Sequence, residues 1–467
     1  MIRSSWIRLL TCAAVVCLGI GAGPGATSRA ADPAADDAVV RPPRFDYHME
    51  TLENGLQVVL LEDHSTPVVH VAVWYHVGSK DEKPGRTGFA HLFEHLMFKG
   101  SRNVRPDQHP SWITSIGGEA NAETDEDTTI YWQTVPAHHL PLVLWLEADR
   151  MASLDVSEDK FLTEREVVKE ERRMRFENQP FGRLPEIIYS HAFTTHPYRH
   201  QTIGSMEDLE AASIEDVRAF HRTYYVPNNA TVVIVGDFET EQAMALVRRY
   251  LGRVPRGNPV PRDIPVEPPQ TEEKVVTVTE PWPLPVVVLS HHITYDGHPD
   301  AYPLHILAKV MSDGDSSRLY RTLVYEKQLA LAAFGQAKLI EHPNLFYMVA
   351  VVLPGVDPDR VMAELVDQVE RVKAEGITQA ELDRAKRQFA RDYILGRETV
   401  RQKALHLGHA VVIHDDITTA DGEFDLFQNV TLEDVQRVAQ TYFTETSRMR
   451  LTILPRGSQP AAAGALR

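Results

Sequence analysis

The sequence has only two cysteines among its 467 residues, and both, Cys12 and Cys17, lie close to the N-terminus. The rest of the chain therefore forms no intramolecular disulfide and offers no thiolate to a metal ion. Cysteine-based catalysis is excluded for the same reason. Any metal must be held by histidine and carboxylate side chains, and the fold must be stabilised by packing.

The sequence also lacks an excess of positive charge and long apolar runs. Its formal net charge is −17, which does not favour the basic face that nucleic-acid binding needs. Beyond the N-terminus no run is apolar over the ~20 residues that cross a bilayer. With 43% hydrophobic and 24% charged residues, the chain has the composition of a folded protein.

The N-terminus is predicted to be a secretory signal. Arg3 and Arg8 accompany an apolar stretch at 9–20, and residues 28–30 form a small-x-small cleavage site. We therefore expect residues 1–30 to be a signal peptide and the protein to be periplasmic or secreted. An uncleaved anchor is the alternative, although the apolar stretch is shorter than a membrane span.

A proline-rich segment divides the chain. Six prolines fall within 255–270, which is typical of a stiff extended linker. We expect an N-terminal domain at 45–254, a homologous C-terminal domain at 271–456, and a disordered tail at 457–467.

The two halves share a local pattern that indicates duplication. Residues 213–217 and 431–435 each begin with a hydroxyl residue that is followed by an acid three residues later, as at a helix N-cap. An apolar strand pattern follows each, at 230–235 and 449–454. We therefore predict an α+β fold of two homologous domains, each a mainly antiparallel sheet covered on one face by helices.

The hydrophobic pattern predicts particular elements in the first half. Asn54-Gly55 is a hairpin turn, and the continuous apolar run at 68–77 is typical of a buried strand. A second strand pair is expected at 119–124 and 128–135. Helical patterns cover 87–99, 139–153, 157–177 and 239–250.

A metal-binding pattern lies in the first of these helices, where His91, Glu94 and His95 form a His-x-x-Glu-His motif. His91 and His95 would lie one turn apart on one helix face, so both imidazoles can reach one metal ion, and Glu94 projects beside them. This arrangement suits a catalytic Zn²⁺ and a base for its water. Two buried packing histidines are the alternative, but Glu94 would then need a buried partner as well.

A third ligand is predicted on the helix at 157–177. Glu164 and Glu171 are seven residues apart and share a face, so the pair can serve as ligand and supporting carboxylate. Glu166 and Glu170 are expected to pair with neighbouring basic residues on the solvated face.

These residues resemble the pitrilysin, insulysin and mitochondrial processing peptidase family, which carries the inverted His-x-x-Glu-His motif. The resemblance covers almost the whole chain after the signal, and it is strongest at 76–101 and at 164–171. It implies a zinc endopeptidase that hydrolyses peptides or unfolded polypeptide segments. A non-catalytic assembly or peptide-binding subunit of the same family is the alternative.

The resemblance also implies roles for individual residues. Residues 117–122 look like the family's edge strand, on which a substrate peptide lies as an added strand, so Asn121 and Ala122 would bind substrate. An ordinary hairpin strand is the alternative. The remaining roles are Zn²⁺ binding by His91, His95 and Glu171, water activation by Glu94, and outer-shell support by Glu164.

The second half contains a degraded copy of the motif. Ala308 and Lys309 stand where Glu94 and His95 stand in the first half, so one active site per chain is expected. Other histidine pairs, His291-His292 and His406 with His409, lack a base and a suitably placed acid. They are interpreted as surface or packing residues and not as ligands.

A departure from the family pattern predicts a partner subunit. Active single-gene members usually carry an arginine in the second half and a tyrosine seven residues later, whereas Tyr325 and Ala332 occupy these positions here. Neither replacement supplies the same donors, and the alignment gives no reason to expect Arg318 or Arg321 to substitute for them. We therefore expect a heterodimer in which a homologous subunit provides both groups, with a homodimer as the alternative.

Overall fold

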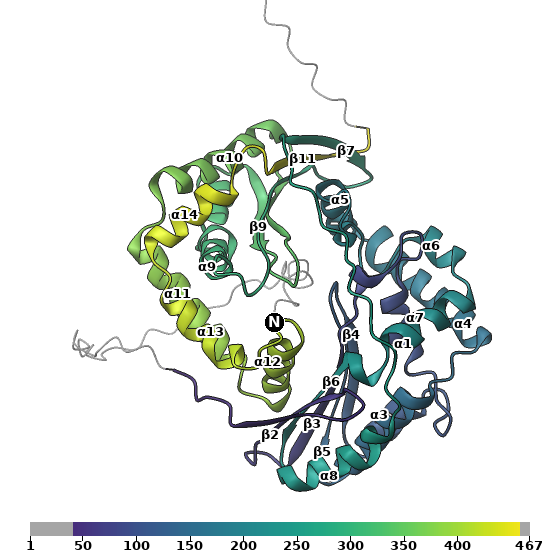
Figure 1. Ribbon diagram of the computed structural model, residues 1–467. Helices are drawn as coiled ribbons and strands as arrows, with labels where there is room; N and C mark the ends of the chain where they lie inside the picture. Colours follow the sequence, from purple (N-terminus) through teal and green to yellow (C-terminus); the bar gives the residue numbers. More distant parts are fainter. Residues whose placement is uncertain (1–40, 458–467) are drawn as a thin grey trace, which may run out of the picture.

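The computed structural model describes residues 41–457, so the predicted signal at 1–30 and all but the first residue of the predicted tail lie outside the described residues. Two sheets, each with its own helices, lie side by side (Figure 1). The first sheet comprises β1 (Tyr47–Thr51), β2 (Gln57–Glu62), β3 (Val68–Tyr75), β4 (Glu119–Thr124), β5 (Thr129–Pro136) and β6 (Ala230–Gly236). The second comprises β7 (Lys274–Glu280), β8 (Val286–His292), β9 (Ala330–Ala337), β10 (Leu345–Val352) and β11 (Arg448–Pro455).

Helices surround both sheets, and none among the described residues is long and apolar enough to cross a bilayer. The first half contains α1 (Phe89–Leu96), α2 (Gln108–Ser115), α3 (Leu140–Ser153), α4 (Glu158–Arg172), α5 (Leu184–Ala192), α6 (Met206–Ala211), α7 (Ile214–Tyr224) and α8 (Thr240–Tyr250). The second contains α9 (Ala301–Ser312), α10 (Pro358–Glu375), α11 (Gln379–Leu395), α12 (Val400–Val412), α13 (Thr419–Gln428) and α14 (Leu432–Tyr442).

The two sheets have the same topology. Their strand orders are β1-β2-β6-β3-β5-β4 and β7-β11-β8-β10-β9, which match strand for strand once β1 is set aside. Each sheet is antiparallel except for one corresponding parallel pair, β2 with β6 and β7 with β11. The predicted α+β fold of two homologous, mainly antiparallel sheets is therefore confirmed.

The predicted elements of the first half are present with small shifts at their ends. The capping boxes predicted at Ser213 and Thr431 are both formed, because each hydroxyl accepts a hydrogen bond from the backbone N–H three residues on. Helix α1 ends at Leu96 and not at 99. Backbone bonds from Phe98 and Lys99 to the carbonyls three residues earlier tighten the chain into the turn at Gly100, whose φ is +99°.

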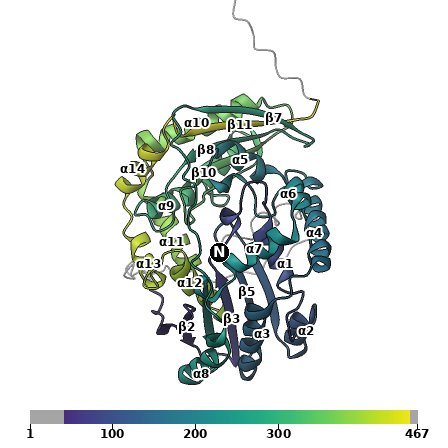
Figure 2. The same ribbon diagram turned by 45° about the vertical axis from the view of Figure 1, so that its right-hand side comes forward.

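Each sheet receives a helix from the other half on its second face. Helix α5 packs its apolar side on the β7–β11 sheet, and α12 packs on the face of the first sheet opposite α3 and α8 (Figures 1 and 2). The α12 contact is close, because a Cβ at Gly408 would lie 2.2 Å from the Trp74 ring. Sequence alone predicted helices on one face only, since the second covering comes from a distant segment.

A buried ionic network also joins the halves. The Lys80 ammonium is almost fully buried and lies 3.0 Å from the Glu341 carboxylate of the second half and 3.7 Å from that of Asp127. His76 Nε2 lies 2.8 Å from the same Glu341 oxygen. Breaking such a network would leave a buried charge without compensation.

We expect Glu341→Gln to lower the free energy of unfolding by roughly 2–3 kcal/mol at neutral pH. Burial opposes ionisation of Glu341, but His76 and Lys80 outweigh it and lower the pKa of this carboxyl to about 2. A lowered pKa stabilises the fold above the unfolded-state pKa, so the advantage of the wild type should shrink as the pH falls from about 5 toward 2. Denaturant unfolding at several pH values measures it.

Glu375→Gln is the matched control for this prediction, because Glu375 is an exposed glutamate at the end of α10. It should change the unfolding free energy by less than about 0.5 kcal/mol. A difference between wild type and Glu341→Gln that stays constant from pH 7 to pH 3 would contradict the assigned electrostatic cause.

Candidate metal centre

The start of α1 is fixed by a buried carboxylate and a glycine. Glu82 accepts hydrogen bonds from the backbone N–H groups of Gly88 and Ala90, each at 2.8 Å, where the helix dipole favours negative charge. Gly88 has a φ of +93°, and a Cβ there would lie 2.8 Å from the Ile203 carbonyl oxygen. Sequence analysis missed Glu82, because a capping acid seven residues before the first residue of the helix has no local signature.

Helices α1 and α4 bring three metal-ligating groups together. His91 Nε2 lies 3.7 Å and His95 Nε2 lies 3.3 Å from Glu171 Oε2. A tetrahedral site with metal–ligand bonds of roughly 2.0–2.1 Å places its ligand atoms about 3.3 Å apart. The three predicted ligands therefore converge at the spacing that one zinc ion requires, and this donor set suits zinc.

Glu164, the other predicted carboxylate, lies behind the cluster. Its Oε2 is 3.5 Å from His95 Nδ1, on the ring edge opposite the nitrogen that faces Glu171. Its Oε1 is 3.3 Å from the Lys99 ammonium, one helical turn after His95. A carboxylate on the distal nitrogen orients a metal-binding imidazole and raises its basicity. Lys99 was not assigned a role from sequence, although its i+4 spacing from His95 was a usable signal.

Burial and the carboxylates give the two imidazoles different protonation states before metal binds. Burial lowers the pKa of His91 to about 4, so this ring is neutral at pH 7. Burial acts on His95 in the same direction, but Glu164 and Glu171 outweigh it and raise the pKa to about 9. Because a metal-binding imidazole must be neutral, zinc binding is expected to release one proton at neutral pH.

The other glutamates of these helices lie where sequence analysis expected them. Glu94 is half-buried on α1, and its charge acts on the neighbouring His95. Glu166 is exposed and lies 3.2 Å from Lys169, and Glu170 is exposed and lies 3.1 Å from Arg173. The prediction that Glu166 and Glu170 belong to the solvated face is confirmed.

The strand that carries Asn121 and Ala122 is an edge strand. β4 pairs with β5 along one side only, and it contacts α1. Asn121 is exposed and Ala122 is buried, as expected for alternate faces of a strand.

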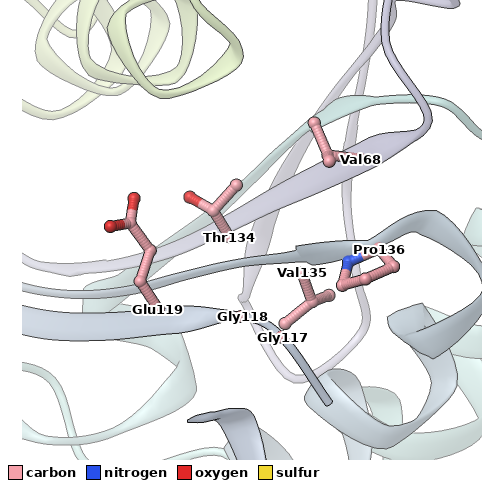
Figure 3. Close-up of a pocket in the computed structure, with 7 residues that line it drawn as sticks. All are labelled: Val68, Gly117, Gly118, Glu119, Thr134, Val135 and Pro136. Carbon is pink, nitrogen blue, oxygen red and sulfur yellow. The ribbon is translucent and has the colours of Figure 1, made fainter.

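At the start of β4, a shallow pocket of about 290 Å³ is lined by residues that include Gly118, Glu119 and Thr134. Glu119 and Thr134 are cross-strand partners and project on the same side (Figure 3). No residue of α1 or α4 lines the pocket, so it is separate from the metal cluster.

The degraded copy of the motif in the second half holds an ion pair. Glu171 and Asp392 are both the fourteenth residue of their helices, α4 and α11. In the second half the Lys309 ammonium, from the position of His95, lies 2.9 Å from the Asp392 carboxylate. A lysine thus supplies the positive charge there, which agrees with one catalytic site per chain.

One histidine prediction is wrong. His291 and His406 are packing residues beside Phe443 and Tyr393, but His409 does have an acid partner. Its Nε2 lies 3.2 Å from Asp296, which is 113 positions earlier in the chain. This contact has no local sequence pattern, because only the tertiary fold brings the loop after β8 to α12.

Comparison with known proteins agrees with this geometry. The family model for insulinase, peptidase family M16, matches residues 57–205, and that for the peptidase M16 inactive domain matches residues 211–389. The zinc protease PqqE of Helicobacter pylori is 33% identical over 409 residues, 87% of this chain and 92% of that protein.

Two solved structures share the fold. The crystal structure of a protease from Helicobacter pylori is 32% identical with a TM-score of 0.85, over 88% of this chain and 100% of that one. The periplasmic protease PqqL of Escherichia coli is 16% identical with a TM-score of 0.72, over 89% of this chain and 48% of that one. From the family matches and the similarity to PqqE, the chain belongs to peptidase family M16, the insulinase family, as a zinc protease.

Proposed function

We propose that the protein is a zinc endopeptidase that hydrolyses peptides or unfolded polypeptide segments, with His91, His95 and Glu171 as its zinc ligands. The observation that carries this proposal is the convergence of these three side chains from α1 and α4. Zinc bound there supplies a Lewis acid next to the peptide carbonyl. The two domains proposed at 45–254 and 271–456, joined by the linker at 255–270, then divide into a zinc-binding domain and a homologous inactive domain.

Glu94 is the proposed general base. It accepts a proton from the attacking water and passes that proton to the leaving amine, so one carboxylate serves both steps. Glu164 is the proposed positioning residue, since its carboxylate lies between His95 and the Lys99 ammonium. It holds the imidazole with its Nε2 atom toward the metal position.

The free side of β4 is the proposed substrate-binding edge. An extended peptide can add to it as a further strand, through backbone hydrogen bonds that do not depend on substrate sequence. Asn121 and Ala122 lie in the middle of this edge, on a strand that contacts α1. Such binding favours substrates that are already unfolded, because a folded chain cannot present a free extended segment.

We also propose that the chain is the zinc-carrying subunit of a heterodimer and that it acts in the periplasm or outside the cell. Arg318 is half-buried and held by Glu381 at 2.7 Å, so it is not available to replace the missing arginine, whereas Arg321 is exposed and lies 3.0 Å from Glu326. Tyr325 is 79% exposed. PqqL supports the pairing, because this chain corresponds to about half of that longer protein.

The experiment compares the purified chain alone with the chain plus a homologous subunit that carries the arginine and tyrosine. The lone chain should bind zinc but cleave an unfolded polypeptide slowly, and the homologue should raise turnover by roughly 10²-fold or more, the usual worth of a transition-state donor. Full turnover by the lone chain, unchanged by any homologue, would refute the division of labour and leave the zinc assignment intact.

A variant of this chain that carries both missing groups itself tests the proposed division of labour without a partner subunit. Tyr325→Arg combined with Ala332→Tyr should raise the activity of the lone chain, because it restores both groups at their expected positions. Ala332→Arg alone is the matched control, since it leaves Tyr325 in place and so exchanges the positions of the two groups, and it should give no gain.

A further inference from the structure

A second cluster of metal-ligating side chains lies in the other half of the molecule. Asp296 follows β8, His409 is on α12, and His414 comes just after that helix. Asp296 Oδ2 lies 3.2 Å from His409 Nε2 and 3.4 Å from His414 Nε2. These spacings match the roughly 3.3 Å edge of a tetrahedral zinc site, as do those of the catalytic cluster.

The hydrogen bonds of His414 leave its other nitrogen directed at Asp296. The Thr419 hydroxyl donates to the Asp416 carbonyl at 2.8 Å, so toward His414 Nδ1, at 2.9 Å, it acts as the acceptor. Nδ1 therefore carries the proton, and Nε2 of the neutral ring carries a lone pair. That Nε2 is buried and makes no hydrogen bond within the described residues. A lone pair that faces a carboxylate oxygen is repelled by it, and a proton or a metal cation between the two atoms removes that repulsion.

The carboxylates around the cluster have only histidines as basic partners. Glu423 on α13 interacts electrostatically with Asp296, His409 and His414, so two carboxylates meet two imidazoles. Among the described residues, no lysine or arginine forms an ion pair with Asp296 or Glu423. This differs from the degraded motif, where the Lys309 ammonium neutralises Asp392. A divalent cation between Asp296 and the two imidazoles would add the positive charge that a lysine supplies in that motif.

We propose that Asp296, His409 and His414 form a second divalent-cation site, of the zinc class, that is structural and distinct from the catalytic centre. Two imidazoles and one carboxylate suit Zn²⁺ and disfavour Ca²⁺ and Mg²⁺, which prefer oxygen ligands. His409 is 43% exposed at its side chain, so water can complete the coordination.

The position of the site indicates what it does. Helix α12 carries His409 on one side and packs on the first sheet through Gly408 and its neighbours. Asp296 belongs to the loop after β8 of the second sheet. A cation bound to both therefore fastens α12 to the second half while the helix covers the first, and so fixes the relative position of the two halves.

Metal content tests the proposal independently of catalysis. With zinc chloride as the probe, the wild type should bind two equivalents, and His91→Gln/His95→Gln, which lacks the catalytic site, should keep one. Adding His414→Gln should remove the remaining equivalent. Adding His406→Gln should not, since His406 lies on the same helix outside the cluster. Cobalt substitution of the double variant should give the visible absorption of a low-coordinate His-ligated site.

Thermal unfolding gives a second readout that needs no further variant. Zinc should raise the Tm of His91→Gln/His95→Gln by a few degrees, and a chelator should reverse the shift, because a ligand that binds only the folded state stabilises it. If the double variant binds no zinc and shows no Tm shift, the cluster is only a set of ion pairs and the proposal is overturned. The proposed peptidase function would be unaffected by that result.

Discussion

Glu94→Gln is expected to reduce kcat/KM for peptide hydrolysis by about 10²- to 10⁴-fold, the range that a positioned general base contributes. The carboxamide keeps the shape of the side chain but cannot accept a proton from water. Zinc binding should persist because the three proposed ligands are unchanged. Steady-state cleavage of an unfolded polypeptide, with zinc content measured on the same sample, checks both halves of the expectation.

The control for this variant is Glu166→Gln, an exposed position on α4 that lies beside Lys169. It should retain wild-type activity. Substantial cleavage by Glu94→Gln would show that another residue is the general base. Loss of zinc together with activity would show that Glu94 supports the metal site and not the proton transfer.

Glu171→Gln is expected to remove most of the affinity for the catalytic zinc, by more than the roughly 10- to 100-fold that an outer-shell change costs. The neutral amide cannot replace the carboxylate that faces both His91 and His95. Zinc titration in a His414→Gln background isolates this site from the second one. Removing the zinc with a chelator should abolish cleavage in the same way.

Two neighbouring glutamates provide comparisons for the zinc affinity of Glu171→Gln. Glu170→Gln should leave the zinc affinity unchanged, because that side chain is exposed and pairs with Arg173. Glu164→Gln should fall between the two, within the outer-shell range, since it contacts His95 on the nitrogen away from the metal position. If Glu170→Gln lost zinc and Glu171→Gln kept it, the assignment of α4 would be wrong.

The sequence by itself determined those features that depend on residues close together in the chain. Helix periodicity placed His91 and His95 one turn apart and put Glu164 and Glu171 on one face, and these residues do meet. The continuous apolar run of β3 indicated a strand buried on both faces. The repeated capping pattern at Ser213 and Thr431 revealed the duplication that the strand orders confirm.

Only the tertiary structure decided which distant segments meet. Glu82 at the start of α1, the exchange of α5 and α12 between the sheets, and the Lys80–Glu341 contact all join residues without a shared local pattern. The same holds for Asp296, which meets His409 only because a loop and a helix far apart in the chain pack together. Periodicity predicts which face of a helix or strand a side chain occupies. It does not predict which distant segment packs against that face, because this is decided by the packing of whole elements.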